Sequence, residues 1–451
     1  MGWIGAVCRK HIGADDCALL YSAWAGAPPD RDTETVHSGN PDTPASVPSP
    51  LGPRRRRDHA GGTRIVDHDN ALPKPGFSKP DRHSRFFAQS LSGASHCRHM
   101  KQLDPDTFLA EISWKARQRR HPDSVTFELT YGCNLRCVHC FNPTHRALPQ
   151  ELTTKEIQQI LNQLAELGIL TVTFTGGELG TRPDLQEIFY HTRQLGLVIR
   201  VLTNATRVTT EFVHLLHDVG AGQVCVSIYG ATAATYERMT TVAGSYVAFR
   251  RGLTLLASST IPIVVRMPVT SLNYEEIHLC RSIAEELKCK FQYSFDLTPI
   301  VTGDLTPLQY RLSAETKIRI DQDMLPQWGS APVEEPCFTA GEFIECACGH
   351  TRFAITPYGE MNLCTAFPIP RYDLKTGTVR EGWECLKRTI DEAHPNHRYE
   401  CPTCNVRFYC RQGRNDAWLE TGDMSVCLPH YQEWATLEHR THALLDPRRP
   451  A

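Results

Sequence analysis

Residues 152–175 read LTTKEIQQILNQLAELGILTVTFT, a helix pattern followed at once by a strand pattern. Thr153 and Glu156 fit a capping box, and apolar residues then recur at helical spacing up to Gly168, a residue type that commonly ends helices. Residues 171–175 alternate polar and apolar side chains, as a half-buried strand does. This stretch therefore predicts one repeating unit of an α/β fold.

The same alternation of strand and helix continues on both sides. Expected strands lie at 125–130, 171–175, 198–203, 224–229, 261–269 and 291–297. Expected helices lie at 152–168, 183–195, 211–219, 246–257 and 275–287. Strands separated by helices predict a parallel sheet, either open and doubly wound or an incomplete barrel. In both architectures ligands gather at the carboxyl ends of the strands.

Charge and hydropathy exclude several classes of protein. The chain has 451 residues, with 48 Lys+Arg against 50 Asp+Glu and a net charge of −2. Such a balance excludes a broad affinity for nucleic acid or anionic membranes. Since the sequence shows neither an apolar run long enough to span a bilayer nor a secretory signal, we expect a cytoplasmic protein with no membrane or nucleic-acid partner.

Residues 1–99 differ in composition from the rest. They contain 10 Pro and 10 Gly, while Leu, Ile, Val and Phe together number 15. We expect a disordered leader or an upstream extension, with the basic run 54–57 as a possible docking arm and Met100 as a possible natural start. The further predicted segments are an N-terminal segment 100–122, an α/β domain 123–300, a linker 301–336, a cysteine-rich domain 337–435 and a tail 436–451.

Eighteen cysteines are the most unusual feature of the composition. In a long chain without a secretory signal, they indicate metal ligation rather than disulfides. The first expected strand leads into Cys133-x3-Cys137-x2-Cys140. Three thiolates can hold a [4Fe–4S] cluster and leave one iron open to a reactant. The alternative is structural zinc, which would need a fourth ligand such as His139.

Polar residues end the next strands. The second is followed by Gly176-Gly177-Glu178, the third by Asn204, and the fourth contains Ser227. The segment that carries Cys133, Cys137 and Cys140 is called the cysteine loop below. Combined with this loop, the polar strand ends resemble those of the radical S-adenosylmethionine (radical SAM) enzymes. The resemblance implies a partial (β/α)6 radical SAM barrel. It also implies that Gly176, Gly177 and Glu178 hold the methionine amino group of S-adenosylmethionine.

Further contacts of S-adenosylmethionine follow from the same resemblance, namely Asn204, Ser227, Arg238 and His139. His139 stands where family members often have an aromatic residue. The implied mechanism is one-electron reduction of S-adenosylmethionine by the cluster held by Cys133, Cys137 and Cys140. The products are methionine and a 5′-deoxyadenosyl radical, which abstracts hydrogen from a substrate C–H bond. No catalytic residue for the substrate is assigned, although Tyr131, Asp296, Tyr358 and Glu360 lie near predicted site loops.

A second set of cysteines resembles the SPASM extension of radical SAM enzymes, a small cysteine-rich domain with auxiliary [4Fe–4S] clusters. Its motifs are Gly359-x4-Cys364, preceded by Cys346 and Cys348, and Cys401-x2-Cys404-x5-Cys410, followed by Cys427. The resemblance implies one cluster on Cys401, Cys404, Cys410 and Cys427, and a second on Cys337, Cys346, Cys348 and Cys364.

Position 414 departs from the SPASM pattern, because Arg414 stands where a further cysteine is expected. Cys337 and its three partners could complete the second cluster, one iron could stay open, or the cluster could be absent, so one or two auxiliary clusters are expected. Zinc is the alternative occupant of these thiols. The other seven cysteines are expected to be plain thiols: Cys8, Cys17, Cys97, Cys225, Cys280, Cys289 and Cys385.

Radical SAM enzymes with this extension mostly modify peptides, so the resemblance implies a maturase of a ribosomally made precursor peptide. A separate leader-binding protein and a one-electron reductant such as flavodoxin or ferredoxin are the expected partners. Two alternatives remain open. One is a small-molecule or tetrapyrrole maturase with the same clusters, and the other is a non-catalytic zinc-binding interaction protein.

Overall fold

The computed structural model describes residues 114–324 and 342–445, all within one compact unit, Cys97–Ala451. The predicted leader 1–99 and Cys337 lie outside the described residues, as do parts of the predicted linker and tail. The described helices include none that is both long and apolar enough to cross a membrane.

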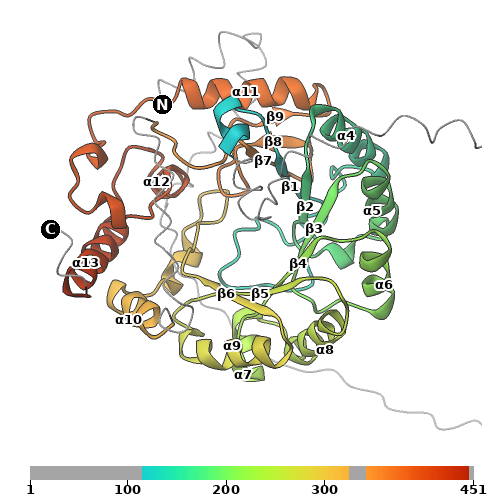
Figure 1. The fold of residues 1–451 in the computed structure, drawn as a ribbon, viewed down its shortest axis with the longest axis horizontal. Helices are drawn as coiled ribbons and strands as arrows, with labels where there is room; N and C mark the ends of the chain where they lie inside the picture. Colours follow the sequence, from blue (N-terminus) through green and yellow to red (C-terminus); the bar gives the residue numbers. More distant parts are fainter. Residues whose placement is uncertain (1–113, 325–341, 446–451) are drawn as a thin grey trace, which may run out of the picture. The chain divides into compact units, whose positions relative to one another are not determined.

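A nine-stranded sheet forms the centre of the fold (Figure 1). Its order is β6-β5-β4-β3-β2-β1-β7-β8-β9. All pairings from β6 to β7 are parallel, and β8 and β9 are antiparallel additions. The strands are β1 (Ser124–Glu128), β2 (Thr171–Thr175), β3 (Val198–Thr203), β4 (Gln223–Ser227), β5 (Ile263–Pro268), β6 (Lys290–Ser294), β7 (Arg352–Ile355), β8 (Glu360–Asn362) and β9 (Tyr372–Asp373).

Helices cover the outer face of the strands, which curve around an interior (Figure 1). Those of the barrel are α4 (Thr154–Leu167), α5 (Leu185–Gln194), α6 (Thr210–Asp218), α7 (Ala233–Thr240), α8 (Ser245–Ala257) and α9 (Ile277–Glu286). The remaining helices are α10 (Ala314–Met324), α11 (Val379–Asp391), α12 (Arg414–Thr421) and α13 (Pro429–Leu445). This arrangement confirms the predicted partial α/β barrel.

The local signals in the sequence act as expected at α4. Thr153 and Glu156 form both hydrogen bonds of the capping box, and Gly168 ends the helix in the left-handed conformation, with φ of 90°. The start of α5 was predicted wrongly at position 183. Asp184 does not cap that helix, because its carboxylate binds Arg182 and Thr154 instead, and the helix begins at Leu185.

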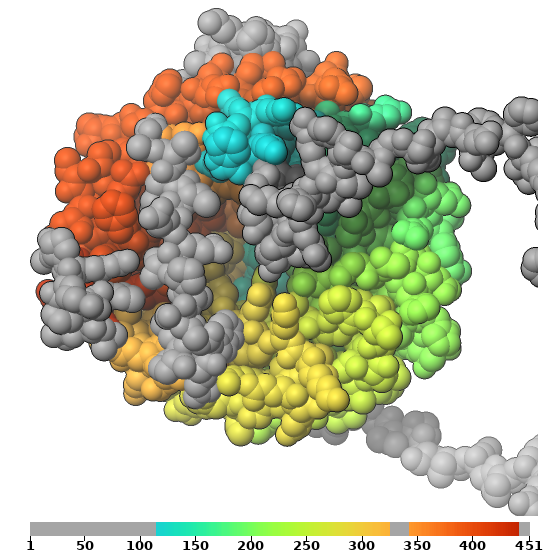
Figure 2. All heavy atoms as spheres, viewed as in Figure 1, coloured from blue at the N-terminus to red at the C-terminus, as the bar shows by residue number. Residues whose placement is uncertain are grey.

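The cysteine-rich segment is joined to the barrel rather than packed as a separate sheet. β7 pairs in parallel with β1, and Phe353 of β7 packs against Trp383 of α11, with ring centroids 5.7 Å apart. The backbone N–H of Val379, which begins α11, donates to Gln163 of α4 at 2.8 Å. Figure 2 shows α11 beside α4 at the rim of the described residues. Hydrophobic periodicity in the sequence did not predict β7–β9, because these strands have only two to four residues each.

Candidate radical SAM site

The loop after β1 brings the first three cysteines together. Backbone N–H groups of Arg136 and Val138 donate to the carbonyls of Thr240 and Met239, which fixes the loop on the end of α7. Burial is the main cause that raises the pKa values of Cys133, Cys137 and Cys140, the last to about 12. The charges of Cys133 and Cys140 also raise the pKa of Cys137, so the three sulfurs lie close to one another.

These thiols have the chemistry of a cluster ligand set. The N–H of Leu135 donates to Cys133 Sγ at 3.4 Å, and the N–H of Asn142 donates to Cys140 Sγ at 3.5 Å. Such contacts favour a charged thiolate, whereas burial opposes it. A bound metal removes this conflict because it deprotonates the thiols that coordinate it. The donor set therefore fits the [4Fe–4S] cluster that the sequence predicts.

Gly176 and Gly177 dock the end of β2 against the cysteine loop. A Cβ at Gly176, whose φ is +137°, would lie 2.2 Å from the carbonyl oxygen of Thr130. A Cβ at Gly177 would lie 2.1 Å from the carbonyl oxygen of Gly132. The N–H of Gly177 donates to Thr130 at 2.6 Å. Both glycines are thus required by a close approach of two backbones, one of which carries Cys133.

Glu178 joins the ends of β2 and β3. Its carboxylate is 3% exposed and accepts from Thr203 Oγ1 and from the N–H of Asn204, each at 2.8 Å. Burial raises the pKa of Glu178, while these hydrogen bonds oppose the rise. Asn204 Nδ2 in turn lies 3.9 Å from Cys133 Sγ. Glu178 and Asn204 therefore stand beside the cysteine loop, and their contacts with S-adenosylmethionine stay predictions.

The other predicted contact residues are more dispersed. Ser227 hydrogen-bonds Tyr229, and the ring of His139 packs 5.1 Å from the ring of Tyr229. Burial lowers the pKa of His139 to about 4, which makes it a neutral ring. Arg238 donates to the carbonyl of Leu272 at 2.5 Å on an exposed face of α7. The roles of these side chains toward S-adenosylmethionine stay predictions.

Two tyrosines beside the cysteine loop were missed by sequence reasoning. Tyr229 hydrogen-bonds the thiol of Cys137 and packs 5.5 Å from the ring of Tyr236. Tyr236 is fully buried, and its hydroxyl lacks a hydrogen-bond partner among the described residues. His139 Nδ1 is a second buried polar atom without such a partner. Unsatisfied polar atoms at this position are consistent with a bound group that completes the site. The only signal in the sequence was the position of Tyr229 at the end of an expected strand.

A polar cluster surrounds Tyr131, which lies between β1 and the first cysteine of the same loop. Tyr131 hydrogen-bonds Glu128, and its ring meets the ring of Tyr358 edge-on at 5.5 Å. Burial is the largest cause that raises the pKa of Tyr131, and the charges of Glu128 and Glu360 raise it further. Of the four side chains that the sequence placed near predicted site loops, Tyr131, Tyr358 and Glu360 therefore lie together. The fourth, Asp296, interacts instead with Lys317 of α10.

Glu128 was also missed by sequence reasoning. It is 3% exposed, and burial raises its pKa to about 8. Its charge raises the pKa of Cys140, which places the carboxyl group close to the cysteine loop. A carboxyl group that is neutral below pH 8 can donate a proton as well as accept one. The sequence did hold one signal for Glu128, since a carboxylate at the end of the first strand lies directly before the cysteine loop.

The C-terminal cysteines form two groups. Cys348 interacts with both Cys346 and Cys364. The contact with Cys348 raises the pKa of Cys346. The contact with Cys346 lowers the pKa of Cys348, but the contact with Cys364 and burial outweigh it and raise that pKa above the usual thiol value. In the second group, the charges of Cys401 and Cys404 act on Cys410 and on Cys427. Cys385 belongs to neither group and lies in α11 beside Arg388. The structure thus gathers the residues that the sequence assigns to two auxiliary sites, with Cys337 outside the described residues.

Arg414 lies at the four-cysteine group. Its Nη2 is 3.8 Å from Cys401 Sγ, and its Nη1 donates to the carbonyl of Met424 at 3.1 Å. The guanidinium packs over the rings of Tyr399 and Phe343 at 5.3 and 5.9 Å. Within residues 114–324 and 342–445, no three His, Cys, Asp or Glu side chains are spaced to hold a single metal ion.

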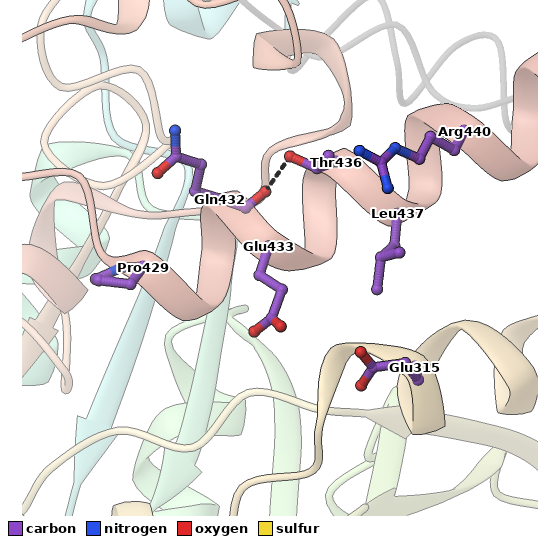
Figure 3. A pocket seen from close by; sticks show the side chains of 7 residues that line it. All are labelled: Glu315, Pro429, Gln432, Glu433, Thr436, Leu437 and Arg440. Atoms are coloured by element: carbon purple, nitrogen blue, oxygen red, sulfur yellow. Dashed lines mark hydrogen bonds between the residues drawn. The ribbon is translucent and has the colours of Figure 1, made fainter.

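A hollow of about 470 Å³ lies elsewhere, between α10 and α13 (Figure 3). Its lining residues are Glu315, Pro429, Gln432, Glu433, Thr436, Leu437 and Arg440. None of them is a predicted ligand of a cluster or of S-adenosylmethionine.

Comparisons with known proteins agree with this geometry. Residues 127–282 match the model of the radical SAM superfamily. The chain is 28% identical to an AdoMet-dependent heme synthase of Methanosarcina barkeri, over 67% of this chain and 94% of that protein. It is 33% identical to the mycofactocin maturase MftC of Mycobacterium ulcerans, over 67% of this chain and 85% of that protein.

A solved structure shows the same fold. The structure of Streptococcus suis SuiB bound to the precursor peptide SuiA aligns with a TM-score of 0.55 and 17% identity. The alignment covers 72% of this chain and 80% of SuiB. Together, the cysteine loop on the partial barrel, the family match and the relatives in sequence show that the chain belongs to the radical SAM superfamily, whose enzymes use a [4Fe–4S] cluster and S-adenosylmethionine.

Proposed function

We propose that this chain is a maturase that modifies a ribosomally made precursor peptide by radical chemistry. The observation that carries the proposal is the cysteine loop, which the glycines after β2 and the α7 carbonyls hold rigidly beside Glu178 and Asn204. The similarity to a mycofactocin maturase over 85% of that protein supports a peptide as the substrate.

We assign the cluster that cleaves S-adenosylmethionine to Cys133, Cys137 and Cys140. When bound, this cluster supplies the electron that breaks the sulfonium carbon–sulfur bond. Tyr229 and Asn204 orient the thiols, and buried Tyr236 and His139 exclude water from the cysteine loop. Glu128 is the candidate to hold or accept a proton on the substrate side, since its carboxyl group is buried beside Cys140.

The first experiment uses the full chain, purified without oxygen and reconstituted with iron and sulfide. We expect 5′-deoxyadenosine after addition of dithionite and S-adenosylmethionine. At four irons per cube, about twelve irons would indicate three clusters and about eight would indicate two. Cys137→Ser should abolish the nucleoside, whereas Cys385→Ser, outside both cysteine groups, should not. Zinc in place of iron, with no nucleoside, would overturn the proposal.

The substrate is tested in the same reaction. A short peptide encoded beside the gene should change mass only when S-adenosylmethionine is present. We also propose that a separate leader-binding protein delivers this peptide and that flavodoxin or ferredoxin is the reductant. Tight binding of the unmodified precursor to the chain alone would contradict the need for a delivery protein.

A tetrapyrrole maturase is the second candidate function. The heme synthase relative supports it, because the alignment covers 94% of that protein. Nucleoside formation driven by an iron-porphyrin precursor of heme, with no effect of any peptide, would favour this candidate over the first.

A further inference from the structure

The loop that follows β5, residues 269–276, belongs to none of the motifs that identify the radical SAM site. Glu276 of this loop accepts four hydrogen bonds from the start of α7. The backbone N–H groups of Ala231 and Thr232 donate to its carboxylate at 2.6 and 3.1 Å. The hydroxyl groups of Thr232 and Thr235 donate to it at 2.7 Å each. One side chain from the loop therefore holds the beginning of this helix.

Glu276 makes these contacts as a charged group. Burial raises its pKa, but the four hydrogen bonds outweigh burial and leave that pKa below its ordinary value. The side chain is therefore a carboxylate near neutral pH. Hydrogen bonds to a charged acceptor are stronger than those between neutral groups, so Glu276 is a firm anchor for α7.

The same loop holds the last turn of α7 as well. The guanidinium of Arg238 donates to the carbonyl of Leu272 at 2.5 Å. The hydroxyl oxygen of Thr270, which is fully buried, lies 3.3 Å from the sulfur of Met239. Helix α7 is thus fixed at both of its ends by a single loop.

The last turn of α7 in turn fixes the middle of the cysteine loop. The carbonyl of Met239 accepts from the N–H of Val138 at 3.0 Å. The carbonyl of Thr240 accepts from the N–H of Arg136, also at 3.0 Å. These two N–H groups belong to the residues on either side of Cys137. The position of Cys137 therefore depends on the position of α7.

A second set of contacts leads from the loop to the same cysteine. Asn273 is 1% exposed, and its Nδ2 donates to the carbonyls of Tyr229 and Pro268 at 3.1 and 3.0 Å. Its Oδ1 accepts from the N–H of Thr270 at 2.7 Å, which fixes the orientation of the amide. Tyr229 hydrogen-bonds the thiol of Cys137. The loop after β5 thus supports Cys137 through α7 and through the end of β4.

We propose that Glu276 is a positioning residue of the radical SAM site, which fixes Cys137 through α7. The inference rests on the proposed function in one respect, since it takes Cys137 as a ligand of the cluster that cleaves S-adenosylmethionine. Groups that hold metal ligands in place from outside affect the binding and the reactivity of the metal. We therefore expect a change at Glu276 to reach the cysteine loop.

The test is hydrogen–deuterium exchange of the reconstituted full chain, with the cysteine loop resolved by peptide mass spectrometry. In Glu276→Leu, we expect the N–H groups of Arg136 and Val138 to exchange about tenfold faster, because α7 opens more easily. Glu276→Gln should restore slow exchange, since its amide oxygen can accept from the backbone N–H groups while the threonine hydroxyls rotate to accept from its NH2 group. Glu275→Leu is the matched control, because Glu275 is exposed and contacts Tyr274 instead.

A second measurement follows the rate of 5′-deoxyadenosine formation. In Glu276→Leu this rate should fall by about tenfold or more at unchanged iron content, because small displacements of reacting groups are costly. Glu276→Gln should recover the rate, and Glu275→Leu should keep it. A wild-type chain that forms no nucleoside would contradict the proposed function. The exchange of the cysteine loop would still test the positioning role in that case.

The N–H groups of β3 report whether the variant folds. If they too exchange faster, Thr235→Val replaces Glu276→Leu, since it removes one of the four hydrogen bonds. The expected change at Arg136 and Val138 is then smaller but in the same direction. Faster exchange at the start of α7, with unchanged exchange at Arg136 and Val138, would overturn the proposal.

Discussion

Arg414 Nη2 lies 3.8 Å from Cys401 Sγ, so a fixed positive charge touches the four-cysteine group. The side chain is held from three directions, by the carbonyl of Met424 and by the rings of Tyr399 and Phe343. Position 414 is where the SPASM pattern has a cysteine. The arginine is directed at Cys401, and it therefore acts on the group formed by Cys401, Cys404, Cys410 and Cys427.

Arg414→Met should make the reduction potential of the cluster at this group more negative. A nearby positive charge favours the reduced, more negative state of a cluster, and its removal should shift the potential by roughly 50 mV after solvent screening. The measurement is a redox titration followed by electron paramagnetic resonance, with iron content determined in parallel. Arg411→Met is the control, because Arg411 contacts Glu438 and Trp434 instead. An unchanged potential in Arg414→Met would show that the charge has no effect on the cluster.

Gly177→Ala should disrupt the cysteine loop. Its Cβ would lie 2.1 Å from the carbonyl oxygen of Gly132, and the backbone there has no flexible side chain that can move aside. We expect loss of the iron held by Cys133, Cys137 and Cys140, about four atoms per chain, and of 5′-deoxyadenosine formation. Gly196→Ala is the control, since its Cβ would meet nothing within 4 Å. It should cost only the roughly 1 kcal/mol of a positive φ and keep its iron.

Tyr236→Phe should stabilise the apoprotein. The Tyr236 hydroxyl is buried without a hydrogen-bond partner among the described residues. An unsatisfied buried polar group costs about 1–3 kcal/mol. Tyr246→Phe is the matched control, since that hydroxyl donates to the carbonyl of Ala231 and its loss should lower the Tm. Thermal unfolding of both apoproteins gives the comparison. A lower Tm for Tyr236→Phe would mean that its hydroxyl has a partner in solution.

Lys317→Met should raise the Tm at pH 7 more than at pH 9.5. Lys317 is 4% exposed, and burial lowers its pKa from 10.5 to about 8. Between these two values the unfolded chain binds more protons than the folded chain, so the contribution of Lys317 to stability improves as pH rises from 8 to 10.5. Below pH 8 its charge costs on the order of 3 kcal/mol, at about 1.4 kcal/mol per pKa unit.

The control for Lys317→Met is Lys387→Met, which removes a more exposed lysine paired with Glu384. Differences in Tm between each variant and the wild type are compared at both pH values, because other groups also titrate in this range. An equal difference for Lys317→Met at pH 7 and pH 9.5 would contradict the lowered pKa.

The barrel was predictable from sequence because its signals are local. The capping box at Thr153, the stop at Gly168 and the alternation in 171–175 each act within a few residues, and the structure reproduces all three. Helix α7 was missed since its eight residues carry a weak apolar pattern. Strand β7 was missed because its pairing with β1 joins segments more than 200 residues apart. Strands β8 and β9 were missed because they have only three and two residues.

The sequence by itself determined the fold class, the three-cysteine loop, the glycines after β2 and the departure at Arg414. Each of these depends on residue type and spacing along the chain. Only the tertiary structure decided that Gly177 approaches Gly132, that Glu128 and Glu360 reach Tyr131, and that Arg414 lies on Cys401. These contacts depend on strand register and side-chain direction, which packing between distant segments fixes and local patterns do not record.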